Sequence, residues 1–382
     1  MKHNRKVIFY VSGHGFGHAS RQIEIINALT AICPDVGVIV RTSAPRWLFD
    51  RGTTTPVTFA PGETDTGVVQ INSLQVDPSA SVRLAWQFHH TLKERAKEES
   101  LLINRCGVTL VVGDIPPLAF ASAALARLPS VAIGNFTWDW IYQHYQNQLS
   151  LPPQLLPTIR NAYASAELAW ELPMSAGFER FPHIIKTPLV ARHARRQPAD
   201  TRKALGLPIE QTLILVSFGR YGLNTVDWNT ITRSGDFGII LTRDPVDRGP
   251  TLPNPESNHK LYSIDLPAIT VRGFGYEDLV AAADIVISKP GYGIIAECAA
   301  NDTALIYTSR GDFAEYNVLV ENMPKLLRCT YLEQNNLFAG QWAEAVHRVI
   351  TQPPVPRPRT DGAHVIAQGL AQQLESGPPA GY

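Results

Sequence analysis

Short runs of apolar residues alternate with polar or glycine-rich turns and with helical segments along the first third of the chain. Each run is five to seven residues long and apolar almost throughout, as expected of strands in a parallel sheet buried on both faces. Apolar residues at helical spacing follow the first run, at Ile23, Ile26 and Leu29, and indicate a core-facing helix. The expected strands are residues 6–12, 36–41, 108–113 and 130–134, with a helix of small residues at 117–127. This alternation predicts a doubly wound α/β domain.

The same pattern returns in the second half of the chain after an interruption rich in basic residues. Residues 186–203 hold six Lys or Arg side chains and one acid, Asp200. We interpret this segment as a solvated linker between domains, with an anion-binding strip as the alternative. Further strands are expected at residues 212–217, 238–242 and 284–288.

The C-terminal part of the chain is predicted to be a connector and one helix. Residues 351–361 contain four prolines and suggest an extended segment. An apolar stripe of Ile366, Leu370 and Leu374 then indicates a helix. We therefore expect an N-terminal Rossmann-like domain at residues 1–190, a second α/β domain at 191–350, and a connector, helix and frayed tail at 351–382.

The composition is that of a globular protein with no excess of either charge. Lys and Arg total 34, as do Asp and Glu, and hydrophobic residues reach 45% against 18% charged. These values exclude a disordered chain and argue against a protein that coats nucleic acid or acidic lipid. The cysteines are far apart without a CxxC pair, which argues against a zinc ribbon or disulfide scaffold. No apolar stretch approaches the length of a signal-peptide core or a membrane span, so we expect a cytoplasmic protein.

The first loop with unusual chemistry is residues 11–21, VSGHGFGHASR, after the first predicted strand. Its spacing is GxGxG, not the GxGxxG of dinucleotide sites. The second strand ends at Arg41, where an NAD site needs an acid, so NADP stays open as an alternative.

His14 and His18 are four residues apart, but only His18 would lie on the helix and no nearby Glu or Cys completes a metal site. We predict that His18 transfers a proton, with helix capping as the alternative interpretation.

In the second α/β domain, the loop at residues 216–222, VSFGRYG, has groups suited to phosphate. The hydroxyl of Ser217, the amide of Gly219 and the cation of Arg220 could all contact phosphate oxygens. This loop occupies the same place after its strand as the first loop does in the N-terminal domain.

Residues 287–300, ISKPGYGIIAECAA, are predicted to turn from a strand into a helix. The unpaired N–H groups at Gly291, Tyr292 and Gly293 would attract an anion by roughly 0.3–1 kcal/mol. Glu297 falls one turn into that helix and is expected to bind neutral hydroxyls, such as those of a ribose. A solvated glutamate favoured by the helix dipole is the alternative.

Two further loops combine groups that suit sugars. Residues 308–317 gather hydrogen-bond acceptors that could hold a donor sugar, and these are Asp312, Glu315 and Asn317. Residues 134–145, GNFTWDWIYQHY, combine indole rings with carboxamide and carboxylate groups. The candidates on this acceptor side are His14, Asn135, Trp138 and Asp139. An equally weighted alternative for residues 134–145 is that their aromatic side chains do not bind a sugar but are packed at an interface.

Together these loops resemble the GT-B class of nucleotide-sugar glycosyltransferases. SKPGYGIIAE resembles the donor loop of the cell-wall N-acetylglucosaminyltransferases, whose last Glu holds the ribose and corresponds to Glu297. VRGFGYEDLVAAADIVIS resembles their base-binding segment, which implies that Phe274 and Gly275 lie near a uracil-like ring. SGHGFGHASR resembles their first glycine-rich loop, whose His corresponds to His18. The ordered motifs GHGFGHASR, LVVGDIPPLAFASAALA, NFTWDWIY and SKPGYGIIAE also resemble the glycosyltransferase-like half of L-arabinokinase, over residues 6–350.

The resemblance implies an α/β fold of two facing Rossmann-like domains with a cleft between them. We hypothesise an inverting, metal-independent transfer of a sugar from a UDP-sugar to an unidentified small-molecule or lipid-linked acceptor, with no cofactor beyond that co-substrate. His18 would be the base, and Asp114, at the end of its strand, would orient the imidazole. Two alternatives stay open: a nucleotide-sugar 2-epimerase that uses Asp312 or Glu315, and a non-catalytic nucleotide-sugar sensor.

Overall fold

A computed structural model of the chain describes residues 5–219, 223, 226–243 and 260–376. The chain divides into two units, and each unit is assembled from separate segments. The N-terminal unit comprises Met1–Val69, Asp77–Ala191 and Arg359–Tyr382, and the C-terminal unit comprises Gln70–Val76 and Arg192–Pro358. This division differs from the predicted one at residues 70–76, which belong to the C-terminal unit, and from residue 351 onward, where residues 351–358 join the C-terminal unit and the rest joins the N-terminal one. The boundary between the two units lies one residue later than predicted, after Ala191.

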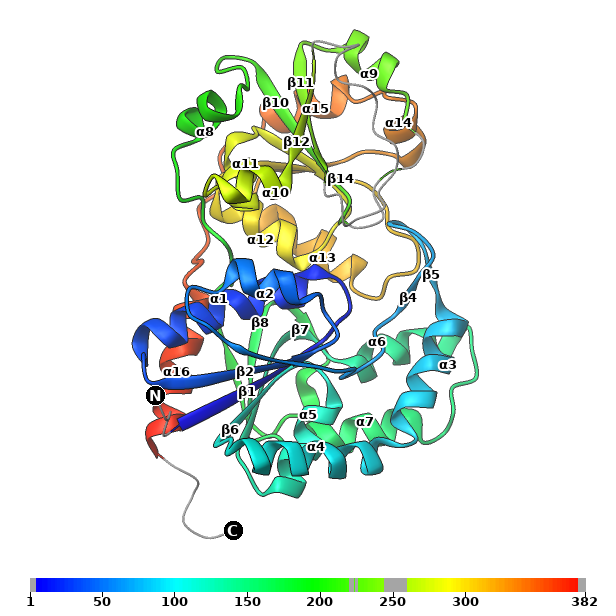
Figure 1. Ribbon diagram of the computed structural model, residues 1–382. Coiled ribbons are helices and arrows are strands. Elements are labelled where there is room, and N and C mark those ends of the chain that lie inside the picture. The colour runs from blue at the N-terminus through cyan, green and yellow to red at the C-terminus, as the bar shows by residue number, and fades with distance from the viewer. Residues whose placement is uncertain (1–4, 220–222, 224–225, 244–259, 377–382) are drawn as a thin grey trace. The chain divides into compact units, whose positions relative to one another are not determined.

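The N-terminal unit is built on a parallel sheet, to which its described residues contribute seven strands in the order β3-β2-β1-β6-β7-β8-β9 (Figure 1). The strands are β1 (Arg5–Val11), β2 (Val36–Thr42), β3 (Thr58–Pro61), β6 (Leu110–Asp114), β7 (Ser130–Phe136), β8 (Leu168–Ala176) and β9 (Ile184–Lys186). Strands β6 and β7 are buried throughout, as their continuous apolar sequence predicts. The strand order reverses between β1 and β6, where an open parallel sheet forms a crevice at its carboxyl ends.

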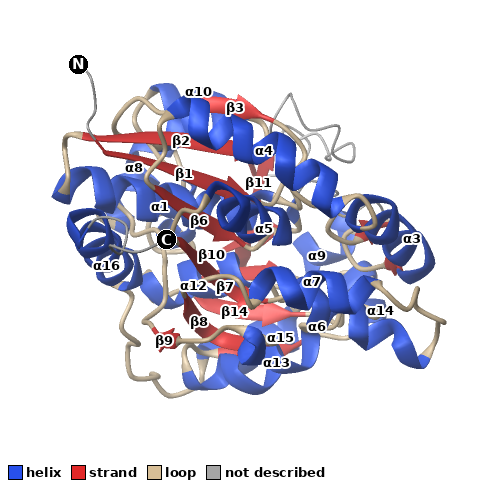
Figure 2. Ribbon diagram, turned by 90° about the horizontal axis from the view of Figure 1, so that it is seen from below, coloured by secondary structure: helices blue, strands red, loops and turns tan. Residues whose placement is uncertain are grey.

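Helices cover both faces of this sheet (Figure 2). Helices α1 and α16 pack on the face that presents Val7 and Phe9, while α4 and α5 pack on the face that presents Ile8 and Tyr10. Successive side chains of a strand point to opposite faces, so one apolar strand serves both helical layers. The helices are α1 (Phe16–Ile32), α2 (Arg46–Gly52), α3 (Pro78–His89), α4 (Leu92–Cys106), α5 (Pro117–Ala126), α6 (Trp138–His144), α7 (Leu155–Tyr163) and α16 (Gly362–Ser376).

Helix α16 returns the chain to the N-terminal unit. It lies beside α1, and its stripe of Ile366, Leu370 and Leu374 is buried in the same core (Figure 1). An antiparallel bridge between Val190 and Asp361 holds the returning segment. The helix predicted from the apolar stripe is therefore an integral layer of the first Rossmann-like domain.

The C-terminal unit repeats the design, and the part of it that the structure describes forms six parallel strands in the order β12-β11-β10-β13-β14-β15. The strands are β10 (Thr212–Ser217), β11 (Phe237–Arg243), β12 (Leu261–Asp265), β13 (Ile285–Ser288), β14 (Ala304–Tyr307) and β15 (Cys329–Tyr331). The helices are α8 (Pro198–Leu205), α9 (Trp228–Ser234), α10 (Leu266–Val271), α11 (Tyr276–Ala282), α12 (Tyr292–Ala300), α13 (Tyr316–Asn322), α14 (Gln334–Phe338) and α15 (Ala343–Ile350). This strand order is that of a Rossmann fold, and it reverses between β10 and β13.

A short hairpin from the N-terminal half of the chain belongs to the C-terminal unit. Its strands are β4 (Val69–Gln70) and β5 (Val76–Asp77) (Figure 1). At its turn, Leu74 is buried in the apolar core of the C-terminal unit, and Ser73 Oγ donates a hydrogen bond of 3.0 Å to the carbonyl of Phe218. The carbonyl of Leu74 also lies against Gly311, where a Cβ would approach it to 2.7 Å. The hairpin therefore packs on the loops that follow β10 and β14.

All four cysteines lie in the described part of the chain and are free thiols. Among the described helices, none combines the length and the apolar character that a membrane span needs.

Candidate functional site

The predicted catalytic residues His18 and Asp114 meet at the reversal point of the sheet in the N-terminal unit. His18 lies in the first turn of α1, Asp114 is the last residue of β6, and His14, predicted on the acceptor side, lies in the loop after β1. Because β1 and β6 are neighbouring parallel strands, with Val11 opposite Asp114, both loops leave the sheet at the same edge. The topology thus brings together two residues that are 96 positions apart.

His18 and Asp114 form a buried pair. Nδ1 of His18 lies 2.9 Å from Oδ1 of Asp114, and the two side chains are 8% and 1% exposed. Burial opposes ionisation of Asp114, but the charges of Arg21 and His18 outweigh it and lower its pKa to about 2. An ionised carboxylate only accepts hydrogen bonds, so Nδ1 of His18 carries the hydrogen. In the neutral imidazole, Nε2 is then the basic nitrogen.

Arg21 and Gln22 hold Asp114 in place. Arg21 Nε and Gln22 Nε2 donate to Oδ2 at 3.0 and 2.7 Å, and Arg21 also donates to Oδ1. Asn135, predicted on the acceptor side, accepts a hydrogen bond from Arg21 and donates one of 2.7 Å to the carbonyl of Pro173. The carboxylate therefore has a fixed orientation, and Asn135 supports it through Arg21.

Asp65 is a second buried carboxyl group at this site, and sequence reasoning missed it. Ser12 Oγ and Trp138 Nε1 donate to its two oxygens at 2.9 and 2.8 Å. Burial raises the pKa of Asp65 to about 6, against the lowering effect of His18. Asp65 lies in a loop without strand or helix pattern, where the sequence ETDTG offered no signal beyond the acid itself.

Two predicted acceptor residues need correction. The ring of Trp138 is 1% exposed, and it stacks on Tyr142 and makes T-shaped contacts with Phe136 and His14, so it packs beneath the surface of the site. Asp139 is buried and paired with Arg160 at 3.0 Å. Both side chains follow β7 as predicted, but packing leaves neither with a surface for an acceptor. His14 is half-buried, with its ring edge-on to Trp138.

In the C-terminal unit, the predicted phosphate-binding loops leave the neighbouring strands β10 and β13 at one sheet edge. Ser217 and Ser288 end these strands opposite one another, and Ser288 Oγ donates to the carbonyl of Ser217. The hydroxyl of Tyr276 donates to Ser217 Oγ at 2.5 Å.

Three glycines of these loops face open space. A Cβ built on Gly219, Gly291 or Gly293 would meet no described atom within 4 Å, so packing does not require glycine there. The open space would let a ligand approach the backbone closely. Gly291 is the N-cap of α12 and Tyr292 its first residue. Arg220, predicted as the cation of this site, lies outside the described residues.

Lys289 and Arg310 are cations at the same edge that the sequence analysis passed over. Lys289 directly follows β13, and the part of the chain that the structure describes offers its ammonium neither a hydrogen bond nor an ion pair. Burial and the charge of Arg310 lower the pKa of Lys289 to about 7, against the opposing effect of Glu315. The guanidinium of Arg310 lies 3.5 Å from the ring centre of Phe313. The Lys in SKPGYG was the available signal.

Glu297 lies in an ion-pair cluster. Arg192 Nε donates to its Oε1 at 2.7 Å, and Arg192 also pairs with Glu277 at 3.5 Å. Burial raises the pKa of Glu297, and Arg192 partly offsets this. Arg192 belongs to the basic segment interpreted as a solvated linker. The structure differs from that interpretation at two positions, because Arg192 is half-buried and Arg202 is buried and pairs with Asp284 at 2.8 Å. The other basic side chains of the segment are exposed, as a solvated linker requires, and these are Lys186, Arg195, Arg196 and Lys203.

The predicted base-binding residues open helix α11. The N–H of Gly275 donates to Asp278 Oδ2 at 2.8 Å, which fixes the start of the helix. The ring of Phe274 is buried, and the guanidinium of Arg196 lies 4.2 Å from its centre. A base contact at this point would have to use the backbone.

The predicted donor-sugar residues follow β14. Glu315 is the N-cap of α13 and acts electrostatically on Lys289. Asp312 is half-buried, and Asn317 is exposed on the first turn of α13. Their contact with a sugar stays a prediction.

Arg41 is engaged by protein groups. It pairs with Glu99 at 2.5 Å, and Glu99 also accepts a hydrogen bond of 2.8 Å from Tyr10. The side chain that an NADP phosphate would need is therefore bound to a carboxylate.

No cluster of three or more His, Cys, Asp or Glu suited to a metal occurs among the residues that the structure describes.

Comparison with known proteins identifies the architecture. No protein-family model matches the chain. The L-arabinokinase of Arabidopsis thaliana is 27% identical over 368 residues; the match covers 95% of this chain but only 34% of that protein. A UDP-glucosyltransferase from Polygonum tinctorium superposes with a TM-score of 0.58 at 13% identity, over 97% of this chain and 93% of its own. A UDP-glucose:anthocyanidin 3-O-glucosyltransferase in complex with UDP superposes with a TM-score of 0.61 at 11% identity, over 98% of this chain and 95% of its own.

The chain has the GT-B fold. The expectation of two Rossmann-like domains is thereby confirmed. In a GT-B fold, as in other open parallel sheets, the ligand-binding edge of each domain is the carboxyl edge at the reversal point. His18 and Asp114 lie at that edge in one unit, and Ser217, Lys289 and Gly291 lie at it in the other.

Proposed function

We propose that the protein transfers a sugar from a UDP-sugar to an acceptor hydroxyl, with inversion and without a metal ion. The observation that carries this proposal is the buried His18–Asp114 pair at the reversal point of a GT-B fold. A basic nitrogen supported by a fixed carboxylate is what activation of a hydroxyl requires.

In the proposed step, Nε2 of His18 accepts the proton of the acceptor hydroxyl. The acceptor oxygen forms a bond to the anomeric carbon as the bond from that carbon to the phosphate oxygen breaks, and UDP leaves with the electron pair. Asp114 keeps Nδ1 protonated and stabilises the imidazolium that forms. A base in this position contributes about 10²–10⁴-fold.

The leaving diphosphate is assigned to the C-terminal unit. The amides around Gly291 and Gly293 and the hydroxyl of Ser217 would donate to its oxygens, and Lys289 and Arg310 would supply positive charge. Preorganised donors of this kind stabilise charge that develops in the transition state. The proposed ribose contact is Glu297, where Arg192 opposes protonation of the carboxylate and leaves oxygens able to accept hydroxyl hydrogens.

The test follows UDP release from a panel of UDP-sugars, with and without a panel of acceptors, by phosphorus NMR. We expect His18→Ala to lower turnover by at least 100-fold and to leave UDP affinity unchanged. His364→Ala replaces an exposed histidine of α16 and serves as the control. Full turnover in His18→Ala would remove His18 as the base.

The other outcomes separate the alternatives. UDP-sugar binding without turnover on any acceptor would favour a sensor, and epimerised free sugar without an acceptor would favour an epimerase. Stabilisation by NADP but not by nucleoside diphosphates, in a thermal-shift panel of both, would overturn the proposal.

A further inference from the structure

A second hollow lies in the C-terminal unit, at the amino ends of its strands. It has a volume of about 470 Å³, within the usual range of small-molecule sites, roughly 300–1,000 Å³. Asp284, Asp302 and Arg328, which line it, come shortly before β13, β14 and β15. The predicted phosphate loops leave the opposite ends of β10 and β13, so this hollow is distinct from the donor site.

The hollow carries an excess of positive charge. Four arginines and two aspartates line it. Each aspartate has an arginine partner, because Arg202 pairs with Asp284 at 2.8 Å and Arg357 pairs with Asp302 at 3.0 Å. Arg196 and Arg328 supply the two remaining charges.

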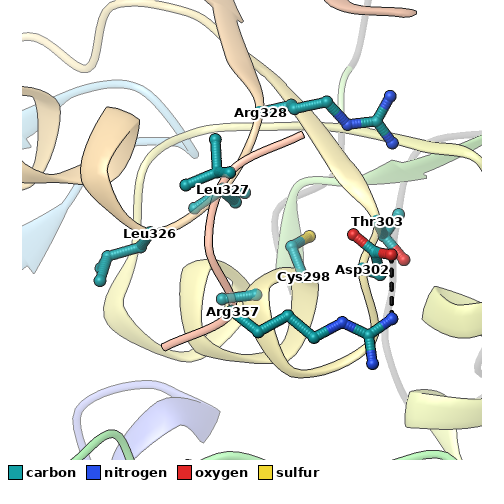
Figure 3. A pocket seen from close by; sticks show the side chains of 9 residues that line it. Cys298, Asp302, Thr303, Leu326, Leu327, Arg328 and Arg357 are labelled. Atoms are coloured by element: carbon teal, nitrogen blue, oxygen red, sulfur yellow. Dashed lines mark hydrogen bonds and ion pairs between the residues drawn. The ribbon is translucent and has the colours of Figure 1, made fainter. Parts of the chain in front are cut away.

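Arg328 presents to the hollow a guanidinium without a protein partner in the described part of the chain. Its side chain is half-buried, yet the described residues provide its guanidinium with no hydrogen bond and no ion pair. Figure 3 shows Arg328 with the Asp302–Arg357 pair around a small adjoining cavity, whose apolar lining includes Leu326 and Leu327. A guanidinium without a protein acceptor has its planar donor groups available for the oxygens of a phosphoryl group.

The hollow also lies where the chain enters and leaves the C-terminal unit. The unit begins at Arg192 and ends at Pro358, and the lining includes residues 196–198 from the entering segment and Arg357 from the leaving one. A ligand that contacts Arg196 and Arg357 together would tie these two segments to each other.

We propose that this hollow is a second ligand site, which binds the phosphoryl group of a small phosphate ester or of free phosphate through Arg328, Arg357 and Arg196. The site is separate from the proposed transferase chemistry. Its occupancy holds the entering and leaving segments of the C-terminal unit together.

The test measures binding of inorganic phosphate and of glycerol 3-phosphate by calorimetry at low ionic strength, in the 382-residue chain carrying Lys289→Met. The Lys289→Met substitution weakens the proposed donor site. Saturable binding of one phosphate that persists in this variant is therefore assigned to the hollow. We expect Arg328→Gln to weaken this binding at least tenfold, while Arg233→Gln, at an exposed arginine of α9, leaves it unchanged. Tighter binding of glycerol 3-phosphate would identify an ester as the ligand, and tighter binding of inorganic phosphate would identify the free ion.

A second variant guards against a folding defect. The side chain of Arg357 is 74% exposed, so Arg357→Gln should fold normally and should also weaken binding. The proposal would be overturned if neither phosphate nor glycerol 3-phosphate binds saturably. It would also be overturned if Arg328→Gln and Arg357→Gln both leave the affinity for these ligands unchanged.

Discussion

At the scale of single residues, His89 in α3 shows what an unsatisfied buried group costs. Its side chain is 1% exposed, and neither ring nitrogen has a hydrogen-bond partner among the described residues. Burial, with a smaller effect of Arg95, lowers the pKa of His89 to about 3. Below pH 6.5 the unfolded chain therefore binds a proton that the folded protein rejects. Folding stability falls by about 1.4 kcal/mol per pH unit over that range.

We predict that His89→Leu protects the protein against mild acid. Removing the imidazole removes this proton uptake, so the stability of the variant relative to wild type should rise by about 2 kcal/mol from pH 7 to pH 5. Urea denaturation at both pH values measures the difference. His364→Leu, on the surface of α16, should show no such change. A wild-type-like pH dependence in His89→Leu would mean that His89 is protonated in the folded state.

The pKa of Lys289 leads to a second prediction at this scale. With a pKa of about 7, Lys289 loses its charge as the pH rises above neutrality. We expect UDP affinity to fall by about an order of magnitude from pH 7 to pH 8.5, where a terminal phosphate with a pKa near 6 is already fully ionised. Lys289→Arg should keep its charge and flatten this dependence.

Titration calorimetry across that pH range measures the affinity. Lys325→Arg, at an exposed lysine, should retain the wild-type slope. A flat profile in the wild type would show that Lys289 does not contact the diphosphate.

The sequence predicted the chemistry of the loops better than the partners of their side chains. His18 and Asp114 could be linked because each sits at a strand end, and strand ends are readable from the pattern. The pairing of Arg192 with Glu297 spans 105 positions and depends on how the entering segment packs, which no local pattern records. Trp138 could not be assigned to surface or core for the same reason, since an indole suits both.

At the scale of elements, the apolar runs located the strands closely. The predicted run 212–217 coincides with β10, and the other six lie within two residues of a strand at each end. The hairpin at residues 70–76 was missed because it is only a few residues long and has no periodicity. Its assignment to the C-terminal unit depends on contacts of Ser73 and Leu74 with residues more than 140 positions away.

Helix α16 provides a prediction at the element scale. Leu370 is fully buried against the core of the N-terminal unit, while Gln368 on the same helix is exposed. We expect Leu370→Ala to lower the free energy of unfolding by about 2–5 kcal/mol and Gln368→Ala to leave it nearly unchanged. Urea denaturation followed by circular dichroism measures both. Equal stabilities would show that α16 is dispensable for this core.

At the scale of the whole molecule, each unit has its own core, and the proposed donor site belongs to the C-terminal one. UDP at 100 times its Kd should stabilise that unit by about 2.7 kcal/mol. In differential scanning calorimetry we expect two unfolding transitions. UDP should raise the midpoint temperature of the transition whose midpoint Leu74→Ala lowers, and Leu370→Ala should lower the midpoint temperature of the other. A single transition that both substitutions lower equally would contradict independent cores.

The position of α16 in the chain also has a consequence for synthesis in the cell. Helix α1 emerges from the ribosome early, but α16, which covers it, follows every residue of the C-terminal unit. At about 5–20 residues per second, the apolar surface of α1 waits for roughly tens of seconds before its covering helix exists. During that interval the nascent N-terminal unit exposes this apolar surface, while the C-terminal unit can already complete its hydrophobic core. The order of translation is thus the reverse of the order in which the two cores can be completed.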